Sequence, residues 1–171
     1  PGSQLTVLTF NTGYGGLGQA QDFFMDGGEM VRPKRADVEG NLAGIQSALQ
    51  EQAADVYFLQ ETDRCSKRSY KIDETAMFRD ALGMSSAFGC NYRCDYVPYP
   101  LPTIGKVESG LLTLTNFSVS DASRAALPVP FSWPLRIANL KRCLLVERIP
   151  IADSGRELVL VNLHLEAYDD G

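Results

Sequence analysis

The chain has 171 residues, of which 44% are hydrophobic and 22% charged, and its formal net charge is −5. This length and composition suit a single globular domain with a buried core, and they exclude a disordered or low-complexity chain. An acidic chain with an isoelectric point near 4.9 lacks the large basic surface typical of proteins that bind duplex DNA. A small phosphorylated substrate remains compatible, because a bound metal ion can supply positive charge.

The termini and the cysteines do not indicate the cellular location of the protein. The opening Pro1-Gly2-Ser3 resembles a remnant of cloning, so we expect the domain over residues 4–171, and an upstream signal or anchor stays open. No stretch reaches the roughly 18 apolar residues of a membrane span. The four cysteines are either reduced core residues or include one disulfide, because their spacing does not fit the paired ligands of a zinc site.

The first part of the sequence predicts a strand, a helix and a second strand. Residues 5–11 (LTVLTFN) predict a strand, and the glycine-rich segment that follows, residues 12–33, is either a surface loop or a rim beside a substrate. Residues 36–53 predict a helix, because apolar side chains recur there at helical spacing. Residues 55–61 (DVYFLQE) predict a buried strand. This order indicates a parallel crossover unit, as in α/β proteins.

The second part predicts mostly strands. A weaker helix is expected over residues 70–82, and residues 83–107 are expected to be irregular because Pro98, Pro100 and Pro102 interrupt them. Residues 110–116 (GLLTLTN) predict a strand, and residues 121–136 a loop around Trp133. Two late strands, 143–151 and 157–165, flank an Asp-Ser-Gly turn and predict a hairpin.

Three apolar strands end in polar residues of chemically useful types. The first ends in Asn11, the second in Gln60-Glu61, and the last in His164. Ligands of α/β proteins gather beyond the carboxyl ends of strands. Amide and carboxylate oxygens suit a hard divalent cation, and an imidazole can donate a proton or contact a phosphoryl oxygen. The three residues together therefore predict a metal and phosphate site.

Each of these residues also has a structural interpretation. Asn11 could be a turn residue, and Glu61 could form an ion pair with Arg64 or Lys67. His164, the one histidine of the sequence, could be a hydrogen-bonded structural residue on the strand face that also carries Asn162. The hypothesis of a site therefore depends on the combination and its order.

The sequence resembles the endonuclease/exonuclease/phosphatase family, which includes deoxyribonuclease I. The resemblance rests on LQE at 59–61, GLLTL at 110–114 and VNLHL at 161–165, in that order, and covers nearly the whole chain. It implies a deoxyribonuclease I-like α/β (α+β) fold, a β-sandwich flanked by helices, of which this chain holds the N-terminal part. It also implies a divalent-metal-dependent phosphoester hydrolase that uses Mg²⁺ or Mn²⁺. Its substrate would be a small molecule, a lipid head group or a nucleic acid.

The resemblance also implies roles for individual residues. Glu61 would be the main metal ligand, with Asn11 beside it at the metal and phosphate site. His164 would contact the scissile phosphate. Glu108 would orient that histidine and raise its pKa, unless it is an exposed strand-end charge. Arg142 would contact substrate, unless it is a solvated strand-end cation.

The sequence departs from the family pattern toward its end. The family's Gly-Asp-Phe-Asn motif and its terminal Asp-His pair do not occur here, and the spacing of Asp169 and Asp170 does not support them as substitutes. We therefore expect the chain by itself to be inactive, to build mainly one sheet, and to self-associate through the open face of that sheet. The alternative function is a non-catalytic binding or scaffold module that retains the fold. The substrate-selecting loops would be those around Tyr99 and Trp133, unless these are packed surface loops.

Overall fold

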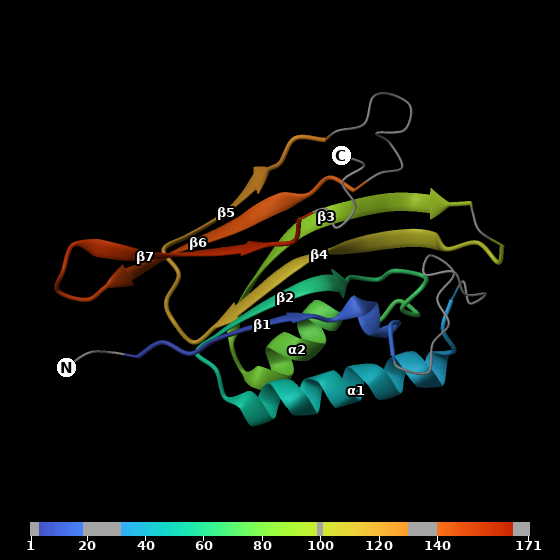
Figure 1. The fold of residues 1–171 in the computed structure, drawn as a ribbon, viewed down its shortest axis with the longest axis horizontal. Coiled ribbons are helices and arrows are strands. Elements are labelled where there is room, and N and C mark those ends of the chain that lie inside the picture. The colour runs from blue at the N-terminus through green and yellow to red at the C-terminus, as the bar shows by residue number, and fades with distance from the viewer. Residues whose placement is uncertain (1–3, 19–31, 99–100, 130–139, 166–171) are drawn as a thin grey trace.

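A computed structural model of the chain describes residues 4–18, 32–98, 101–129 and 140–165. Helices cover one face of a four-stranded sheet, and a three-stranded sheet packs on the other face, so the fold has three layers (Figure 1). The elements in chain order are β1 (Val7–Asn11), the 3-10 turn η1 (Gly13–Gly15), α1 (Arg35–Gln52), β2 (Val56–Asp63), α2 (Glu74–Leu82), β3 (Ser85–Val97), β4 (Gly105–Thr115), β5 (Asp121–Ala126), β6 (Cys143–Ile151) and β7 (Arg156–Leu163).

The first sheet has the order β1-β2-β4-β3 and combines parallel and antiparallel pairs. β1 and β2 are parallel and are joined through α1, which confirms the predicted crossover unit. β4 pairs antiparallel with both β2 and β3. This arrangement puts the ends of β1 and β2 side by side, with Asn11 opposite Gln60.

The second sheet has the order β5-β6-β7 and is antiparallel throughout. It confirms the predicted hairpin of the two late strands. The expectation that this chain builds mainly one sheet is wrong, because this second sheet packs against the first. Leu145 belongs to one buried cluster with Leu111 of β4, and Ile149 and Leu160 belong to another with Val56 of β2. Burial of these apolar side chains between the layers is what keeps the two sheets together.

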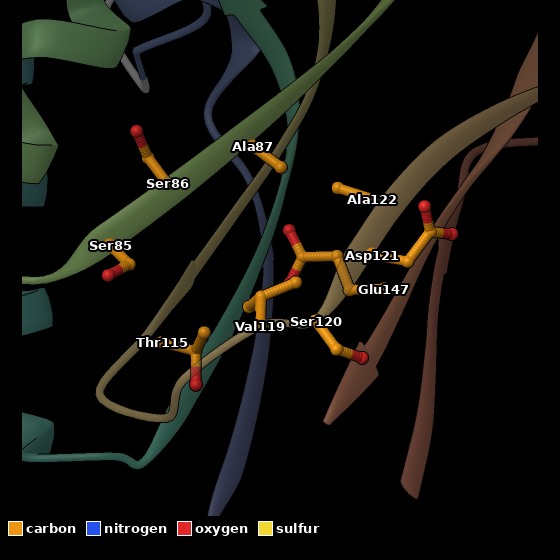
Figure 2. Close-up of a pocket in the computed structure, with 9 residues that line it drawn as sticks. All are labelled: Ser85, Ser86, Ala87, Thr115, Val119, Ser120, Asp121, Ala122 and Glu147. Atoms are coloured by element: carbon orange, nitrogen blue, oxygen red, sulfur yellow. The ribbon is translucent and has the colours of Figure 1, made fainter. Parts of the chain in front are cut away.

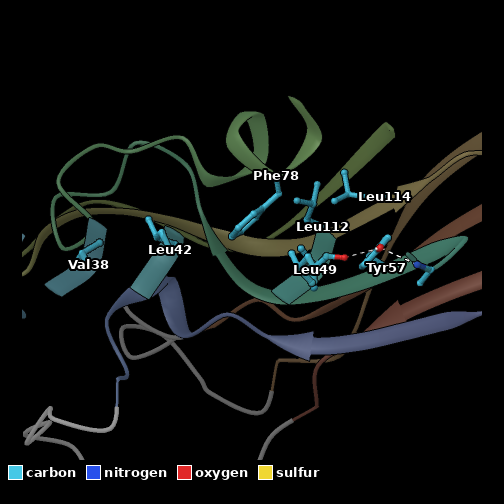
Figure 3. Packing of buried hydrophobic residues seen from close by; sticks show 9 residues of the cluster. Val38, Leu42, Leu49, Tyr57, Phe78, Leu112 and Leu114 are labelled. Carbon is cyan, nitrogen blue, oxygen red and sulfur yellow. Dashed lines mark hydrogen bonds between the residues drawn. The ribbon is translucent and has the colours of Figure 1, made fainter. Parts of the chain in front are cut away.

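The core between the helices and the first sheet follows from the apolar face of α1. Its residues are buried against α2 and the sheet (Figure 3), and the cluster includes Val38, Leu42, Leu49, Tyr57, Phe78, Leu112 and Leu114. The Tyr57 hydroxyl donates a 2.8 Å hydrogen bond to the Leu49 carbonyl and accepts one of 2.9 Å from the Ala54 amide. These two bonds satisfy backbone groups at the end of α1, where helical partners run out.

Two segments that the sequence predicts as irregular are strands. β3 occupies Ser85–Val97 within the expected irregular segment 83–107. Pro98 and Pro102 follow it, and Pro100 lies outside the described residues. The polar and small residues of β3 hide the strand pattern, and ten residue pairs with β4 stabilise it instead. β5 lies in the expected loop 121–136 and is fully exposed, so it too has no apolar alternation to reveal it. The remainder of that loop includes Trp133, which lies outside the described residues.

The shorter helix α2 begins at Glu74, four residues later than expected. The Asp73 side chain accepts a 3.1 Å hydrogen bond from the Ala76 amide and so caps the first turn. Gly83, in the left-handed conformation, ends the helix. All four cysteines are free thiols. Within the described ranges, no helix is both long enough and apolar enough to cross a bilayer.

Candidate active site

Glu61 lies at the centre of the predicted site in an unusual backbone conformation. It has φ +55°, in the left-handed region, where β2 bulges against β4 between Leu59 and Thr62. Residues other than glycine adopt this conformation at a cost, and such strain concentrates at functional sites. The bulge turns the Glu61 side chain away from the alternation of the strand. As a result its carboxylate is partly accessible, with 30% of the side chain exposed.

Asn11 binds the Glu61 carboxylate directly. The Asn11 Nδ2 donates a 3.1 Å hydrogen bond to Glu61 Oε1, and Asn11 Oδ1 accepts one of 2.9 Å from the Gly13 amide. Gly13 has φ +52° at the start of η1, which favours glycine at this position. The glycine-rich segment thus begins with a turn that fixes the Asn11 amide. Asn11 combines both interpretations of the sequence, because it is a turn residue that also orients Glu61.

His164 approaches Glu61 from the second sheet. Its Nδ1 lies 3.9 Å from Glu61 Oε1, which is within ion-pair distance when the imidazole is protonated. Arg142 donates a 2.8 Å hydrogen bond from Nη1 to the His164 carbonyl. Four of the five predicted site residues, from β1, β2, the start of β6 and the end of β7, are therefore brought together in space.

Arg64 and Lys67, the alternative ion-pair partners of Glu61, make other contacts. The Arg64 guanidinium lies over the Phe88 ring, 5.0 Å from its centroid. Lys67 Nζ donates a 3.4 Å hydrogen bond to the Thr103 hydroxyl. The carboxylate of Glu61 consequently faces Asn11 and His164.

Glu108 lies elsewhere on the first sheet. Side chains alternate along β4, so Glu108 shares a face with Leu112 and Leu114, which pack against the helices. The main chain of Glu108 bonds to Arg64 and to the Ser66 hydroxyl. Among the described residues, Glu61 places a carboxylate within ion-pair distance of His164. The role of Glu108 in orienting the histidine stays a prediction.

A buried amide pair, which the sequence does not reveal as part of the site, holds the two sheets in register. Gln60 Nε2 donates a 3.0 Å hydrogen bond to Asn162 Oδ1, and Asn162 Nδ2 donates one of 3.1 Å to the Leu112 carbonyl. Gln60 precedes Glu61 and Asn162 is two residues before His164. This pair therefore sets the distance between the two candidate catalytic side chains. The only signal in the sequence is that both amides interrupt apolar strands.

A buried ion pair between Arg68 and Asp63 supports the candidate site. Arg68 Nε and Nη2 donate hydrogen bonds of 2.9 and 2.8 Å to the carboxylate of Asp63, whose side chain is fully buried. Burial alone would lower the pKa of Arg68, but the Asp63 charge and these hydrogen bonds raise it above its usual value. The Arg68 guanidinium also stacks 3.7 Å from the centroid of the Tyr14 ring. The end of β2 is thereby tied to η1, next to Glu61.

Glu74 adds a buried carboxyl to the same region. Its Oε2 accepts a 2.9 Å hydrogen bond from the Asp63 amide. Burial, together with the nearby Asp63 charge, raises the pKa of Glu74 well above its ordinary value. Glu74 is therefore suited to structural support as a neutral acid rather than to binding a cation.

The donor set at Glu61 fits a hard divalent cation only in part. Glu61 offers a carboxylate and Asn11 an amide oxygen with one lone pair left beside the Gly13 bond. Among the described residues, no three His, Cys, Asp or Glu side chains are grouped to hold a metal. Magnesium commonly uses one or two carboxylates and completes its shell with water and substrate phosphate, so two protein donors are enough for a weak site. Asp169, Asp170, Tyr99 and Trp133 lie outside the described residues.

Comparisons with known proteins identify the fold. No protein-family model matches the sequence, and no curated protein matches it either. The structure is similar to an endonuclease/exonuclease/phosphatase from Beutenbergia cavernae DSM 12333, with TM-score 0.61 and 18% identity over 94% of this chain and 38% of that one. It is similar to an endonuclease/exonuclease/phosphatase family protein from Leptotrichia buccalis C-1013-b, with TM-score 0.56 and 11% identity over 95% and 54%.

A third similar structure is humanized D. rerio TDP2, with TM-score 0.53 and 16% identity over 96% of this chain and 48% of that one. The chain thus spans 38% to 54% of the length of these proteins. Identities this low show the fold alone. The chain has the fold of the endonuclease/exonuclease/phosphatase proteins, which confirms the resemblance and the fold class drawn from the sequence.

Proposed function

We propose that the chain is part of a divalent-metal-dependent phosphoester hydrolase of the endonuclease/exonuclease/phosphatase family. One observation carries the proposal: the Glu61 carboxylate lies between the Asn11 amide, at 3.1 Å, and the His164 imidazole, at 3.9 Å, where strands of two sheets end. The shared fold supports it. A carboxylate, an amide and an imidazole are the groups that this chemistry needs for a cation and a phosphate.

The proposed roles follow from the contacts. Glu61 would hold Mg²⁺ or Mn²⁺, and Asn11 would orient its carboxylate through the Nδ2 bond. The bound metal would polarise a phosphate oxygen. His164 turns Nδ1 toward Glu61, so the opposite ring nitrogen would contact a phosphoryl oxygen and donate a proton to the leaving group. Arg142 would hold the histidine backbone and add positive charge on the substrate side.

The experiment is to change Glu61→Gln in the full-length protein and in this chain. With Mg²⁺ and bis(p-nitrophenyl) phosphate or p-nitrophenyl phosphate, we expect the full-length variant to lose about 100-fold or more of its turnover, since the change removes a metal ligand. Mn²⁺ binding to this chain, followed by electron paramagnetic resonance, should weaken in parallel. Glu51→Gln, an exposed position on α1, is the control with the same change of charge. Unchanged turnover in Glu61→Gln would reject the assignment.

A non-catalytic binding module is the second candidate, and one observation favours it. The described residues place one carboxylate at the site, and no three metal-binding side chains are grouped there. If the full-length protein binds Mn²⁺ through Glu61 but hydrolyses neither phosphoester, this second function is the correct one. For this chain by itself we expect no turnover, because its described residues provide no base beside Glu61 and His164 that would activate water.

A further inference from the structure

A cavity of about 260 Å³ lies between the two sheets, away from Glu61 and His164. Thr115, in its wall, pairs with Val56 at the beginning of β2, whereas Glu61 is near the end of that strand. Figure 2 shows the cavity, which is lined by Ser85, Ser86, Ala87, Thr115, Val119, Ser120, Asp121, Ala122 and Glu147. Ser85, Ser120 and Asp121 are exposed, so the cavity opens to the surface at this edge of the sandwich. It is separate from the candidate active site.

Glu147 is the unusual residue of this cavity. It lies on β6 between Leu145 and Ile149, both of which point into the apolar core between the sheets, and it shares their face. Its cross-strand neighbours are Ala122 and Leu160. Glu147 is 1% exposed, and its Oε2 has no hydrogen-bond partner among the described residues. A buried carboxyl without a hydrogen-bond partner costs free energy. A ligand in the cavity that donates a hydrogen bond to Glu147 would remove this cost.

The walls determine what kind of ligand fits. Figure 2 shows the Glu147 carboxyl directed across the space toward the first sheet, whereas the carboxylate of Asp121, the other ionisable group of the lining, points away from it. No residue of the lining is basic. Ala87, Val119 and Ala122 present small apolar side chains. The cavity therefore combines one acidic group with short apolar walls, and its volume is below the roughly 300–1,000 Å³ of pockets for drug-sized ligands.

We propose that this cavity binds a short aliphatic amine, whose primary ammonium group pairs with Glu147. The ammonium supplies the hydrogen-bond donor that Oε2 lacks, and its positive charge compensates the buried carboxylate. The alkyl chain replaces water along Ala87, Val119 and Ala122. An anionic ligand is disfavoured, because the lining offers acids and no base.

The protonation of Glu147 gives the binding a signature. Burial raises the pKa of Glu147 from 4.5 to about 7. Below that pH the empty cavity holds a neutral acid, and an ammonium that binds must displace its proton. Binding therefore releases up to one proton per amine at pH 6, and affinity increases from pH 6 to pH 8. Asp121, the other ionisable group of the lining, points away from the cavity and does not offset this trend.

Isothermal titration calorimetry of the 171-residue chain with n-butylamine tests the proposal. We expect binding of one amine per chain at pH 8, and proton release at pH 6 that shows as a dependence of the heat on the ionisation enthalpy of the buffer. Glu147→Gln keeps the shape of the side chain and should weaken binding about tenfold or more. Asp153→Asn, in the exposed β6–β7 turn, makes the same charge change and should leave binding unchanged.

A neutral probe separates charge recognition from filling of an apolar space. 1-Butanol has nearly the same size as n-butylamine and should bind about tenfold more weakly or not at all. Equal binding of the two probes, or equal binding by Glu147→Gln, would overturn the proposal. So would an absence of binding at both pH values, which would mean that the cavity holds water only. The proton release of the parent chain tests the proposal independently of the Glu147→Gln variant.

Discussion

The side-chain amide of Gln60 donates a 3.0 Å hydrogen bond to that of Asn162, and this bond joins the middle of the four-stranded sheet to the edge strand of the other sheet. Both side chains are buried, and Asn162 makes further bonds to the first sheet. The candidate active site depends on this link, because Glu61 and His164 belong to different sheets. Three predictions concern this link and the other buried polar groups, and a fourth concerns the exposed strand edges.

Asn162→Leu should destabilise the chain by about 2–3 kcal/mol. The leucine leaves the Gln60 amide and the Leu112 carbonyl buried without this partner, and each unsatisfied group costs free energy. Urea denaturation followed by circular dichroism measures the change. Asn116→Leu, at an exposed position after β4, is the control and should be nearly neutral. Equal effects of the two substitutions would mean that the amide link contributes little.

Asp63→Asn should destabilise the chain by about 3 kcal/mol or more, because it leaves the largely buried Arg68 guanidinium without its bidentate partner. The exposed pair Arg79–Asp80 provides the comparison. Asp80→Asn should change stability by less than about 1 kcal/mol. Thermal and urea unfolding of both variants test this contrast, and a loss in Asp80→Asn as large as that in Asp63→Asn would contradict it.

Glu147→Gln should be more stable than the parent chain at pH 8 but not at pH 4.5. The folded chain loses the Glu147 proton near pH 7 and the unfolded chain near 4.5, so between these values the folded state binds more protons. Raising the pH through this window therefore destabilises the parent, by about 1–2 kcal/mol after allowance for solvent screening. The free energies of unfolding of both proteins, measured without amine at pH 4.5 and 8, should diverge. A constant difference would argue against the raised pKa.

The sheet face through which we expected self-association is covered by the second sheet, so we expect a second copy of the chain to pair at the exposed strand edges instead. In the described part of the chain, β1 and β7 are edge strands of the two sheets, and Phe10 on β1 and Val161 on β7 are exposed, at 45% and 38%. Unpaired strand edges with apolar side chains favour pairing with another chain. Sedimentation velocity should show a concentration-dependent dimer that the double change Phe10→Lys with Val161→Lys weakens.

The control for this experiment is Leu101→Lys, which removes an apolar side chain of 78% exposure between β3 and β4 without touching either edge. It should leave the dimer intact. A monomer that unfolds cooperatively across the accessible concentrations would refute the expectation of self-association.

The sequence by itself determined the elements that carry their own apolar pattern. α1, β2 and the β6–β7 hairpin were predictable because their side chains alternate or recur at a fixed period, and turn residues mark their ends. The same local patterns place Asn11, Glu61 and His164 at strand ends. A polar residue that follows a buried strand can be recognised from the sequence alone. The parallel crossover then brings the ends of β1 and β2 together.

The tertiary structure alone decided the features that depend on pairing between distant segments. β3 and β5 lack apolar alternation and are strands only because β4 and β6 bond to them. The bulge at Glu61, the Gln60–Asn162 bond and the isolation of Glu147 in an apolar layer each require contacts across the sandwich. Sequence periodicity reports the face on which a residue lies. It does not report which residue faces it from the other sheet, and that partner determines whether a buried amide is satisfied or a carboxyl stays neutral.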